Sequence, residues 1–501
     1  MPSIDASFLA LPASLLADAA LSRARELGAE HADFRLERIR TGRISLRDSQ
    51  LESTADDLDL GIAVRVVHSG AWGFASGTEL TPAAAAELAE RAVATARVGR
   101  VLSTDPVRLA AEPVYADASW VSSYQLNPFE VPQPERIGRL AELSDRLLAA
   151  DGVDHVGAQL QHVQENKYYA DTAGTVTSQQ RVRIFPEFTA VQVDLAGGRF
   201  STMRTVAPPA GRGWEYLTGT GWDFDAEIAE LPELLAEHAK APSPEGGKYD
   251  LVIDPTNLWL TIHESIGHAT ELDRALGYEA AYAGTSFATK DKLNNLQYGS
   301  PVLNVTGDRV VEHGLATIGY DDEGVATSEF DIIRDGVLVG YQLNRQMAEA
   351  NGLGRSNGCA YADSPGHIPL QRMANVSLRP DEAGGSTADL IAGVDDGIYV
   401  VGDNSWSIDM QRYNFQFTAQ RFYKISNGRL AGQLRDIAYQ ATTTDFWGAM
   451  EAVGGPQTYL LGGAFNCGKG QPGQVASVTH GCPAALFRGI NVLNTVSEGG
   501  R

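Results

Sequence analysis

The chain has 501 residues, more than a single hydrophobic core usually organises, so we expect two or three domains. Its 63 acidic residues outnumber its 40 basic residues and give a formal net charge of −23, which repels nucleic acid and anionic membrane surfaces. Three cysteines make no disulfide framework, the N-terminus lacks the features of a secretory signal, and no apolar run approaches about 18 residues. The sequence therefore predicts a cytoplasmic protein that binds neither nucleic acid nor membrane.

The first half of the chain repeats one order of elements, a helix followed by a meander of strands. The first unit is predicted to have a helix at 12–27, strands at 32–39, 43–53, 58–67 and 71–77, and a helix at 81–99. The second is predicted to have a helix at 133–150, strands at 154–164, 166–171, 175–185 and 188–196 with a hairpin turn at 171–175, and a helix at 225–239. We therefore predict an N-terminal α+β domain at 1–104, a proline-rich linker at 105–132 and a central α+β domain at 133–240.

The second half of the chain has a different pattern. A short strand at 252–253 leads into a helix, and many short alternating segments punctuated by glycine follow residue 300, such as 337–341 and 415–419. This pattern is typical of an antiparallel barrel or sandwich. We predict that residues 248–501 form a β-rich C-terminal domain carrying the helix, which makes the whole protein a member of the α+β fold class.

One predicted helix holds two imidazoles and a carboxylate within six residues. Asp254 is a suitable N-cap, Pro255 presets the first helical φ, and Gly277 is a suitable stop, so we predict a helix over 255–276. His263, Glu264 and His268 lie inside it among large aliphatic residues, where an unpaired charge would be costly. A bound metal ion would remove that cost, whereas two histidines that merely pack within a long helix are the alternative.

The spacing of the two histidines carries a structural prediction. Zinc proteases commonly place their histidines four residues apart, on one helical face, with the intervening glutamate free to act as a base. His263 and His268 are five residues apart and would diverge by about 140° on a regular helix. Joint ligation therefore predicts a local π-type widening, for which Gly267 offers backbone freedom.

A catalytic metal ion needs a third protein ligand and an open position. Glu271 is one candidate, although the helix would have to bend strongly for it to reach back. Cys467 is the other, and it lies in the glycine-dense stretch 462–473, which we predict as a loop that approaches a bulky centre closely. A buried thiol is the alternative interpretation of Cys467, and it fits Cys359 and Cys482 better.

Four motifs together resemble the TldD/PmbA metalloproteases. They are His263-Glu-x-x-Gly267-His268 with Glu271, Gly319-Tyr-Asp-Asp-Glu-Gly324, Asp395-Asp-Gly-Ile-Tyr399 and Cys467-Gly-Lys-Gly-Gln471. The similarity covers nearly the whole chain and matches the motif-bearing, TldD-like members of the family rather than those that lack the motif. It implies that His263, His268 and Cys467 bind the metal and that Glu264 serves catalysis.

The resemblance implies a metal-dependent peptidase acting on unfolded or short peptides. Two neutral imidazoles and a thiolate favour one Zn²⁺ per active subunit, and iron also accepts this ligand set. The ion would lower the pKa of its bound water, and Glu264 would take the proton as water attacks the scissile carbonyl. An extended peptide would bind by adding a strand to an open sheet edge. The resemblance also implies a dimer that encloses the site, either a homodimer or a heterodimer with a motif-lacking relative.

Two alternatives remain open from the sequence. The chain could be a non-hydrolytic subunit of a protease complex, with a structural metal held by four protein ligands. It could instead resemble the dipeptidyl peptidases that carry a His-Glu-x-x-Gly-His helix and take their third ligand from a downstream glutamate, here Glu271. Exchanging Cys467 and Glu271 in turn, and counting bound metal, separates a cysteine ligand from a glutamate ligand.

Three further features invite a functional interpretation. Asp321, Asp322 and Glu323 form a carboxylate triplet that could bind a second cation or a substrate amine, although a run of acids in a turn is usually solvated. His367 and His480 are isolated in the sequence, and we interpret both as structural. The glycine-rich patches lack the Gly-Lys-Ser/Thr ending of a phosphate-binding loop, so the sequence gives no support for nucleotide binding.

Overall fold

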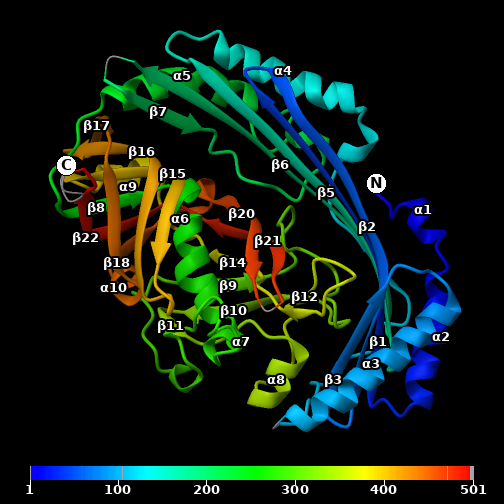
Figure 1. The fold of residues 1–501 in the computed structure, drawn as a ribbon. Coiled ribbons are helices and arrows are strands. Elements are labelled where there is room, and N and C mark those ends of the chain that lie inside the picture. Colours follow the sequence, from blue (N-terminus) through cyan, green and yellow to red (C-terminus); the bar gives the residue numbers. More distant parts are fainter. Residues whose placement is uncertain (1, 104, 196, 471, 497–501) are drawn as a thin grey trace.

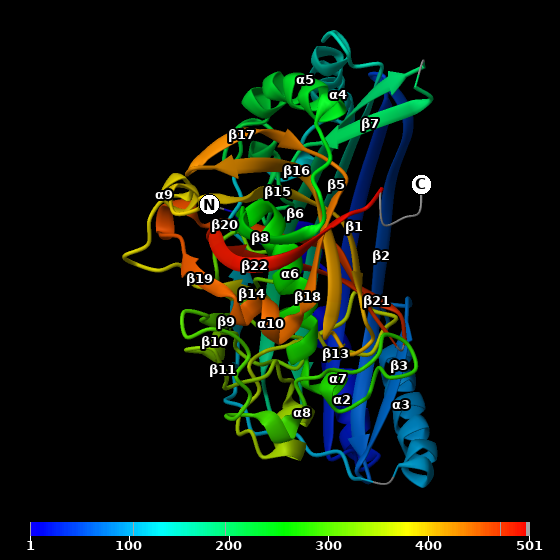
Figure 2. The ribbon, with the colours of Figure 1, turned by 90° about the vertical axis from the view of Figure 1, so that its left-hand side faces the viewer.

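The computed structural model describes residues 2–103, 105–195, 197–470 and 472–496 (Figure 1). A long curved sheet from the N-terminal half lies along one side of the β-rich C-terminal half, and β1 and β2 run along the length of the molecule (Figures 1 and 2). Met1 and Gln471, which belong to the sequence patterns above, lie outside the described residues. No helix in the described part of the chain is long and apolar enough to cross a membrane.

The large sheet has seven strands in the order β3-β2-β1-β5-β6-β4, with β7 also paired to β6. The strands are β1 (His31–Arg47), β2 (Gln50–His68), β3 (Ala71–Gly77), β4 (Ala118–Val121), β5 (His155–Asp171), β6 (Val176–Asp194) and β7 (Arg199–Arg204). The predicted hairpin turn at 171–175 is confirmed between β5 and β6. The predicted strand at 43–53 is wrong, because the chain turns at Asp48 and Ser49, both of which have positive φ.

Several of the predicted short strands are parts of longer ones. The strand β1 continues through Gly42 because the missing side chain leaves room for His162 of β5, whose Nε2 would lie 2.1 Å from a Cβ at this position. The strand β6 continues through Pro186, which lies between the segments that pair with β4 and with β7. The proline therefore faces a stretch of free edge, where its missing N–H costs no ladder hydrogen bond.

The two predicted N-terminal units share this sheet. Strands β1 and β5 pair along their whole length, from Asp33 opposite Asp171 to Arg47 opposite Gly157. The stretch 105–132 contains β4, which pairs with β6 in parallel. The domain boundaries at 1–104, 133–240 and 248–501 stay predictions, but continuous hydrogen bonding joins the first two of these units.

Four helices cover the outer face of the sheet (Figure 1). They are α2 (Ala13–Glu26), α3 (Pro82–Leu102), α4 (Gln133–Leu148) and α5 (Phe224–Lys240), which confirms the helices predicted at 12–27, 81–99, 133–150 and 225–239. The helices α2 and α3 share one hydrophobic cluster with β1 and β2, and α4 and α5 share another with β5 and β6. The short helix α1 (Ala6–Leu9) precedes them.

The C-terminal half contains a closed five-stranded barrel in the order β15-β8-β22-β18-β16, with β16 pairing back to β15. The strands are β8 (Gly247–Ile253), β15 (Asp396–Ile408), β16 (Asn414–Ser426), β18 (Ile437–Thr442) and β22 (Ala485–Asn494), with β17 (Arg429–Leu434) and β19 (Met450–Val453) attached. The predicted barrel and the α+β class are confirmed. One pair is not antiparallel as predicted: β8 and β15 run parallel, since the chain leaves β8 through the helix that begins at Pro255 and returns about 140 residues later.

Smaller elements fill the space between the barrel and the large sheet. A four-stranded sheet contains β9 (Val305–Asp308), β10 (Glu329–Arg334), β11 (Val337–Leu338) and β14 (Asn375–Leu378), and two-stranded sheets contain β12 (Ala360–Tyr361) with β13 (Leu370–Gln371) and β20 (Leu460–Lys469) with β21 (Gln474–Cys482). Three short helices in this half are α8 (Arg345–Asn351), α9 (Thr387–Ala392) and α10 (Thr443–Gly448). The hairpin β20–β21 packs directly on α6 (Pro255–Ile262).

The predicted carboxylate triplet lies at the contact between the sheet and the C-terminal half, and it is buried rather than solvated. Asp322 pairs with Lys167 of β5 at 2.7 Å, and Glu323 pairs with Arg65 of β2 at 3.0 Å. Asp321 accepts backbone N–H groups from three residues of its own half. In this structure the triplet therefore binds protein cations and amides, which makes it part of the contact between the two halves.

Candidate metal centre

The helix predicted over 255–276 is confirmed only in its first part. The chain forms α6 (Pro255–Ile262), a π-helical turn (His263–Gly267), a 3₁₀ turn (His268–Thr270) and α7 (Leu272–Ala275). Asp254 caps the start by accepting the Thr256 N–H, as predicted. The helix breaks at Glu271, where the backbone is extended and forms a bridge with Gln342.

The predicted π-type widening is confirmed. The N–H of His268 donates to the carbonyl of His263, five residues back, and the two imidazole centroids lie 4.7 Å apart. Gly267 has an ordinary helical backbone, so its backbone freedom is not what the turn uses. A Cβ at this position would instead lie 2.6 Å from Sδ of Met373, so the glycine is needed for space.

The structure brings His263, His268 and Cys467 together. Each offers one donor atom, and the three atoms all lie within 4.8 Å of one another. All three side chains are buried, with relative exposures of 4 to 5 %. Sγ of Cys467 lies 3.5 Å from Nε2 of His268. Residues 199 positions apart in the chain thus form one N, N, S donor set, the combination that zinc prefers.

The predicted loop around Cys467 is wrong, because the cysteine lies on strand β20. This strand pairs with β21 in a register that shifts between Ala464 and Cys467. Its glycines allow close packing rather than a loop: a Cβ on Gly462 would lie 2.6 Å from the Trp259 ring of α6. The strand can therefore lie directly against α6, and this packing places Cys467 next to the two histidines.

Hydrogen bonds fix which nitrogen each imidazole presents to the shared space. Nδ1 of His268 lies 2.9 Å from Oε2 of Glu271, so it donates to the carboxylate and leaves Nε2 facing Cys467. Nδ1 of His480 donates to the Val376 carbonyl at 2.8 Å, so its Nε2 accepts from Nδ1 of His263 at 2.7 Å. Both candidate ligands therefore have Nε2 free of a proton, the form that binds metal.

The electrostatic environment holds these groups in the forms that a metal ion requires. Burial lowers the pKa of His263 and of His268 below the usual value, which favours neutral imidazoles. Burial opposes ionisation of the Cys467 thiol, but His268 and Arg372 outweigh it and hold the pKa of the thiol below its usual value. Neutral imidazoles beside an acidified thiol fit a divalent ion.

Glu271 supports the histidine and does not belong to the donor set. Its carboxylate contacts His268 Nδ1 at 2.9 Å and the Lys469 ammonium at 3.0 Å. Burial raises the pKa of this carboxyl, but Lys469 and His268 hold it well below its usual value. Glu271 thus stays ionised behind His268, a position that orients a ligand instead of replacing one.

Glu264 lies beside the donor set and is also buried. Its Oε2 accepts a hydrogen bond from Nη1 of Arg412 at 2.6 Å. Sequence reasoning missed Arg412, and it interpreted His480 as structural without placing it beside His263. Arg412 belongs to a hairpin that no motif marks, and His480 is next to no other histidine or acid in the sequence. Only the pairing of β21 with β20 brings His480 to His263.

The other candidate residues lie outside the donor set. His367 pairs with Asp363 at 2.6 Å near the contact with the large sheet. Cys359 and Cys482 are buried free thiols, as predicted, and burial raises the pKa of each.

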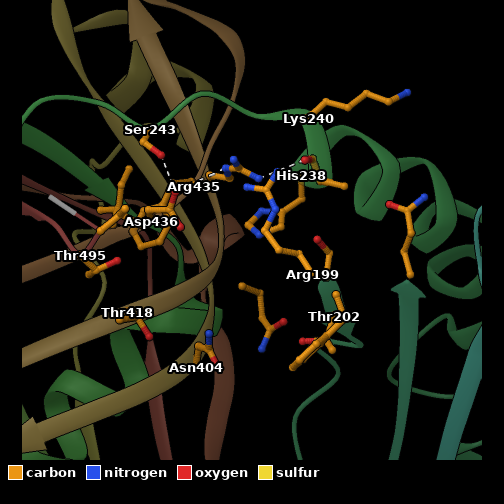
Figure 3. Close-up of a pocket in the computed structure, with 18 of the residues that line it drawn as sticks. Arg199, Thr202, His238, Lys240, Ser243, Asn404, Thr418, Arg435, Asp436 and Thr495 are labelled. Carbon is orange, nitrogen blue, oxygen red and sulfur yellow. Dashed lines mark hydrogen bonds and ion pairs between the residues drawn. The ribbon is translucent and has the colours of Figure 1, made fainter. Parts of the chain in front are cut away.

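Two cavities are relevant to ligand binding. A cavity of about 330 Å³ lies next to the candidate centre, and its walls include Trp259 of α6, Trp406 of β15 and residues 460 and 462–465 of β20. A larger polar cavity of about 1090 Å³ lies between the ends of α5 and β7 and the barrel (Figure 3), lined in part by Arg199, Lys240 and Arg435. The three donor residues line neither cavity, but Trp259 in the wall of the smaller one has its ring centroid 6.3 Å from that of His263, so the smaller cavity is the candidate substrate site.

The fold and the buried donor set define a candidate metalloprotein, and comparison with known families identifies it further. Residues 246–494 match the model described as PmbA/TldA metallopeptidase C-terminal domain, and residues 32–96 match the model described as PmbA/TldA metallopeptidase domain 1. Together the two models match more than half of the chain. The chain belongs to the TldD/PmbA family, as the motifs predicted.

Relatives of known name are similar over nearly their full length. A "Metalloprotease" of Methanothermobacter thermautotrophicus is 27% identical over 93% of this chain and 96% of its own. A "Zinc metalloprotease TldD homolog" of Saccharolobus solfataricus is 24% identical over 94% of this chain and 98% of its own. A "Metalloprotease TldD homolog" of Haemophilus influenzae is 25% identical over 90% of each chain.

Solved structures share the fold. The "putative modulator of a DNA gyrase" of Thermotoga maritima superposes with a TM-score of 0.75 at 18% identity, covering 96% of this chain and 99% of its own. TldE from Thermococcus kodakarensis superposes with a TM-score of 0.72 at 14% identity, covering 95% and 100%.

Proposed function

We propose that this protein is a metal-dependent peptidase that hydrolyses unfolded or short peptides. His263, His268 and Cys467 would hold one Zn²⁺, and the same donors also accept iron. The observation that carries the proposal is the buried N, N, S donor set with both histidines in the metal-binding tautomer. A bound zinc ion would polarise the scissile carbonyl and lower the pKa of water.

Glu264 would act as the general base. It follows His263 directly in the π-helical turn, and the Arg412 contact holds its carboxylate in one orientation. The carboxylate would take a proton from the attacking water and pass it to the leaving amine.

The peptide would bind as an added strand along β20. Among the described residues, β20 pairs only with β21, which leaves its other edge without a partner strand. The 330 Å³ cavity borders the first half of this strand, and Cys467 lies near its end. Cys467 lies four positions after Gly463, or about 13 Å of extended chain. A peptide lying along this edge would therefore reach the centre with a side chain in the cavity.

The assembly and the location of the protein are also part of the proposal. The family resemblance supports a dimer, either of two copies or with a motif-lacking relative, that encloses the site. Such an enclosure would admit extended peptides and exclude folded proteins. A cytoplasmic location without nucleic acid or membrane partners is also proposed, and the formal net charge of −23 supports the lack of anionic partners.

Substitution of the donor residues tests this proposal. His263→Ala, His268→Ala and Cys467→Ala should each lose bound metal and cleavage of an unstructured peptide while the chain stays folded, because a protein of this size does not depend on one ion for its core. His155→Ala, which changes an exposed histidine of β5, is the matched control. Stoichiometric metal in all three variants would refute the site. Global unfolding on loss of metal would instead support a structural ion.

A further inference from the structure

Arg412 is held in an unusual backbone conformation at the tip of the β15–β16 hairpin. Its φ is +62°, a left-handed value that side chains with a Cβ rarely adopt. The turn fixes this value, since Asp409 accepts N–H groups from Gln411, Tyr413 and Asn414. Thr443 also donates to the Arg412 carbonyl at 2.7 Å. Residues held in this way against their preference often lie at functional sites.

The guanidinium of Arg412, at the tip of this hairpin, makes few hydrogen bonds within the described part of the protein. The side chain of Arg412 is 13 % exposed, and Glu264 is the only carboxylate within ion-pair distance among the described residues. Nη1 donates to Glu264, Nη2 makes a long contact of 3.4 Å with the Ala283 carbonyl, and Nε has no hydrogen-bond partner in the described part of the chain. A guanidinium offers five N–H donors, so several remain available to a ligand.

Burial without full pairing is costly for a cation, and it needs a compensating role. Burial lowers the pKa of Arg412 despite the charge of Glu264. Arg274, which lies nearby and is also buried, shows the contrast, because Glu271 and Glu279 both lie within ion-pair distance of it. The spare donors of Arg412 therefore lie beside the proposed base, where a substrate carbonyl would have to lie for water to attack it.

Resting on the proposed peptidase function, we propose that Arg412 is a catalytic residue that donates hydrogen bonds to the scissile carbonyl oxygen and stabilises the charge it gains. Water oxygen bonds to the carbonyl carbon, the C=O electron pair moves to the oxygen, and Glu264 takes the water proton. The electron pair then returns, the C–N bond breaks, and Glu264 passes the proton to the departing amine. While Glu264 holds the proton, the negative charge lies on the substrate oxygen, so the guanidinium keeps a charged partner throughout.

The experiment compares Arg412→Ala and Arg412→Lys with the wild type in the metal-loaded protein. A donor used only in the transition state should lower kcat by about 10² to 10³-fold and leave KM nearly unchanged. Metal content should stay stoichiometric, because Arg412 touches none of the three donor residues. Ethylguanidinium should restore part of the activity of Arg412→Ala at constant ionic strength. It should not raise that of Arg429→Ala, a matched control at an exposed arginine of β17.

A binding measurement provides a readout that does not depend on turnover. A phosphinic analogue of the cleaved peptide replaces the scissile amide with a tetrahedral anionic group, so its affinity reports on the same donors. Calorimetry should show that Arg412→Ala weakens the binding of this analogue by a factor similar to the loss in kcat. The affinity of a product peptide, which lacks the tetrahedral centre, should change little.

Three outcomes would overturn this assignment. A loss confined to KM that disappears when the substrate carries a C-terminal amide would mean that Arg412 binds a terminal carboxylate. Unchanged kinetics would remove Arg412 from the reaction. Lost metal or a lowered melting temperature in both variants, without rescue by ethylguanidinium, would make its role structural. A metal-loaded wild type that neither cleaves peptides nor binds the phosphinic analogue would instead refute the proposed function, and this assignment with it.

Discussion

Two of the places where the protein buries ionisable side chains differ in what those groups face. At the contact between the large sheet and the C-terminal half, three buried carboxylates lie within ion-pair distance of protein cations. Asp322 pairs with Lys167, Glu323 with Arg65, and Glu165 with Arg181. At the candidate centre, the donor atoms of the two histidines and Cys467 face one another instead.

This difference separates a structural cluster from a functional one more reliably than the number of charges does. Buried groups that neutralise one another hold two parts of the chain together and leave nothing for a ligand. Three donors that face a shared space, two of them imidazoles whose other nitrogen is already hydrogen-bonded, would suit a metal ion. The carboxylate triplet looked equally functional in the sequence, and its partners are what distinguish it.

The largest expected effect comes from removing the proposed base without changing its size. Glu264→Gln keeps the hydrogen-bonding shape but loses basicity, so turnover should fall by about 10² to 10⁴-fold while metal and peptide still bind. Metal content, peptide affinity and turnover should be measured on one preparation, with Glu245→Gln as the exposed control. Loss of metal would make Glu264 a ligand, and undiminished turnover would remove it from the mechanism.

A substitution among the buried ion pairs between the large sheet and the C-terminal half should change the stability of the protein rather than its catalytic activity. Lys167→Met would leave Asp322 and Glu37 without their shared ammonium in a buried site, which should destabilise the protein by about 3 to 5 kcal/mol. Chemical denaturation measures the change, and Lys248→Met at an exposed site is the control. If the variant kept full stability but lost metal, the separation between the two clusters would be wrong.

A substitution of Glu271, whose carboxylate contacts the candidate ligand His268, should have a smaller effect. Glu271→Gln removes the charge that faces Nδ1 of His268, and loss of such a partner typically weakens metal affinity by about 10 to 100-fold. Cys467→Ala should abolish binding instead, because it removes a donor. Competition with a chelator measures both affinities. The reverse order, with Glu271 the more important residue, would favour the dipeptidyl-peptidase-like arrangement.

The sequence predicted the helices and the paired histidines because those depend on local patterns, whereas Cys467 was implied as a ligand by the family resemblance. Asp254, Pro255 and the five-residue histidine spacing act within one helix, so the N-cap and the π-type turn follow from nearby residues alone. The continuity of β1 was not predictable in this way, because Gly42 reads as a break until His162 of the neighbouring strand is placed against it.

The parts of the site that the sequence did not reveal depend on contacts between distant segments. His480 reaches His263 across 217 residues, and Arg412 reaches Glu264 across 148. Neither residue lies in a motif, and only the packing of β21 and of the β15–β16 hairpin against α6 places them at the candidate centre. The loop predicted at Cys467 failed for the same reason, because its glycines serve close packing against Trp259 rather than a turn.

The smallest expected effect concerns a buried imidazole outside the centre. His162 of β5 lies under Gly42 and contacts Arg136, and burial together with that guanidinium lowers its pKa to about 3. A histidine whose folded pKa is depressed contributes stability above its unfolded pKa of about 6.5 and loses it as the pH falls towards 3. The free energy of unfolding should therefore drop by about 1.4 kcal/mol for each pH unit below 6.5 from this residue alone.

Chemical denaturation of the wild type and of His162→Gln between pH 7 and about pH 5 isolates the contribution, because every other group titrates in both. Parallel pH profiles for the two proteins would show that folding does not lower the pKa of His162, which would contradict this prediction.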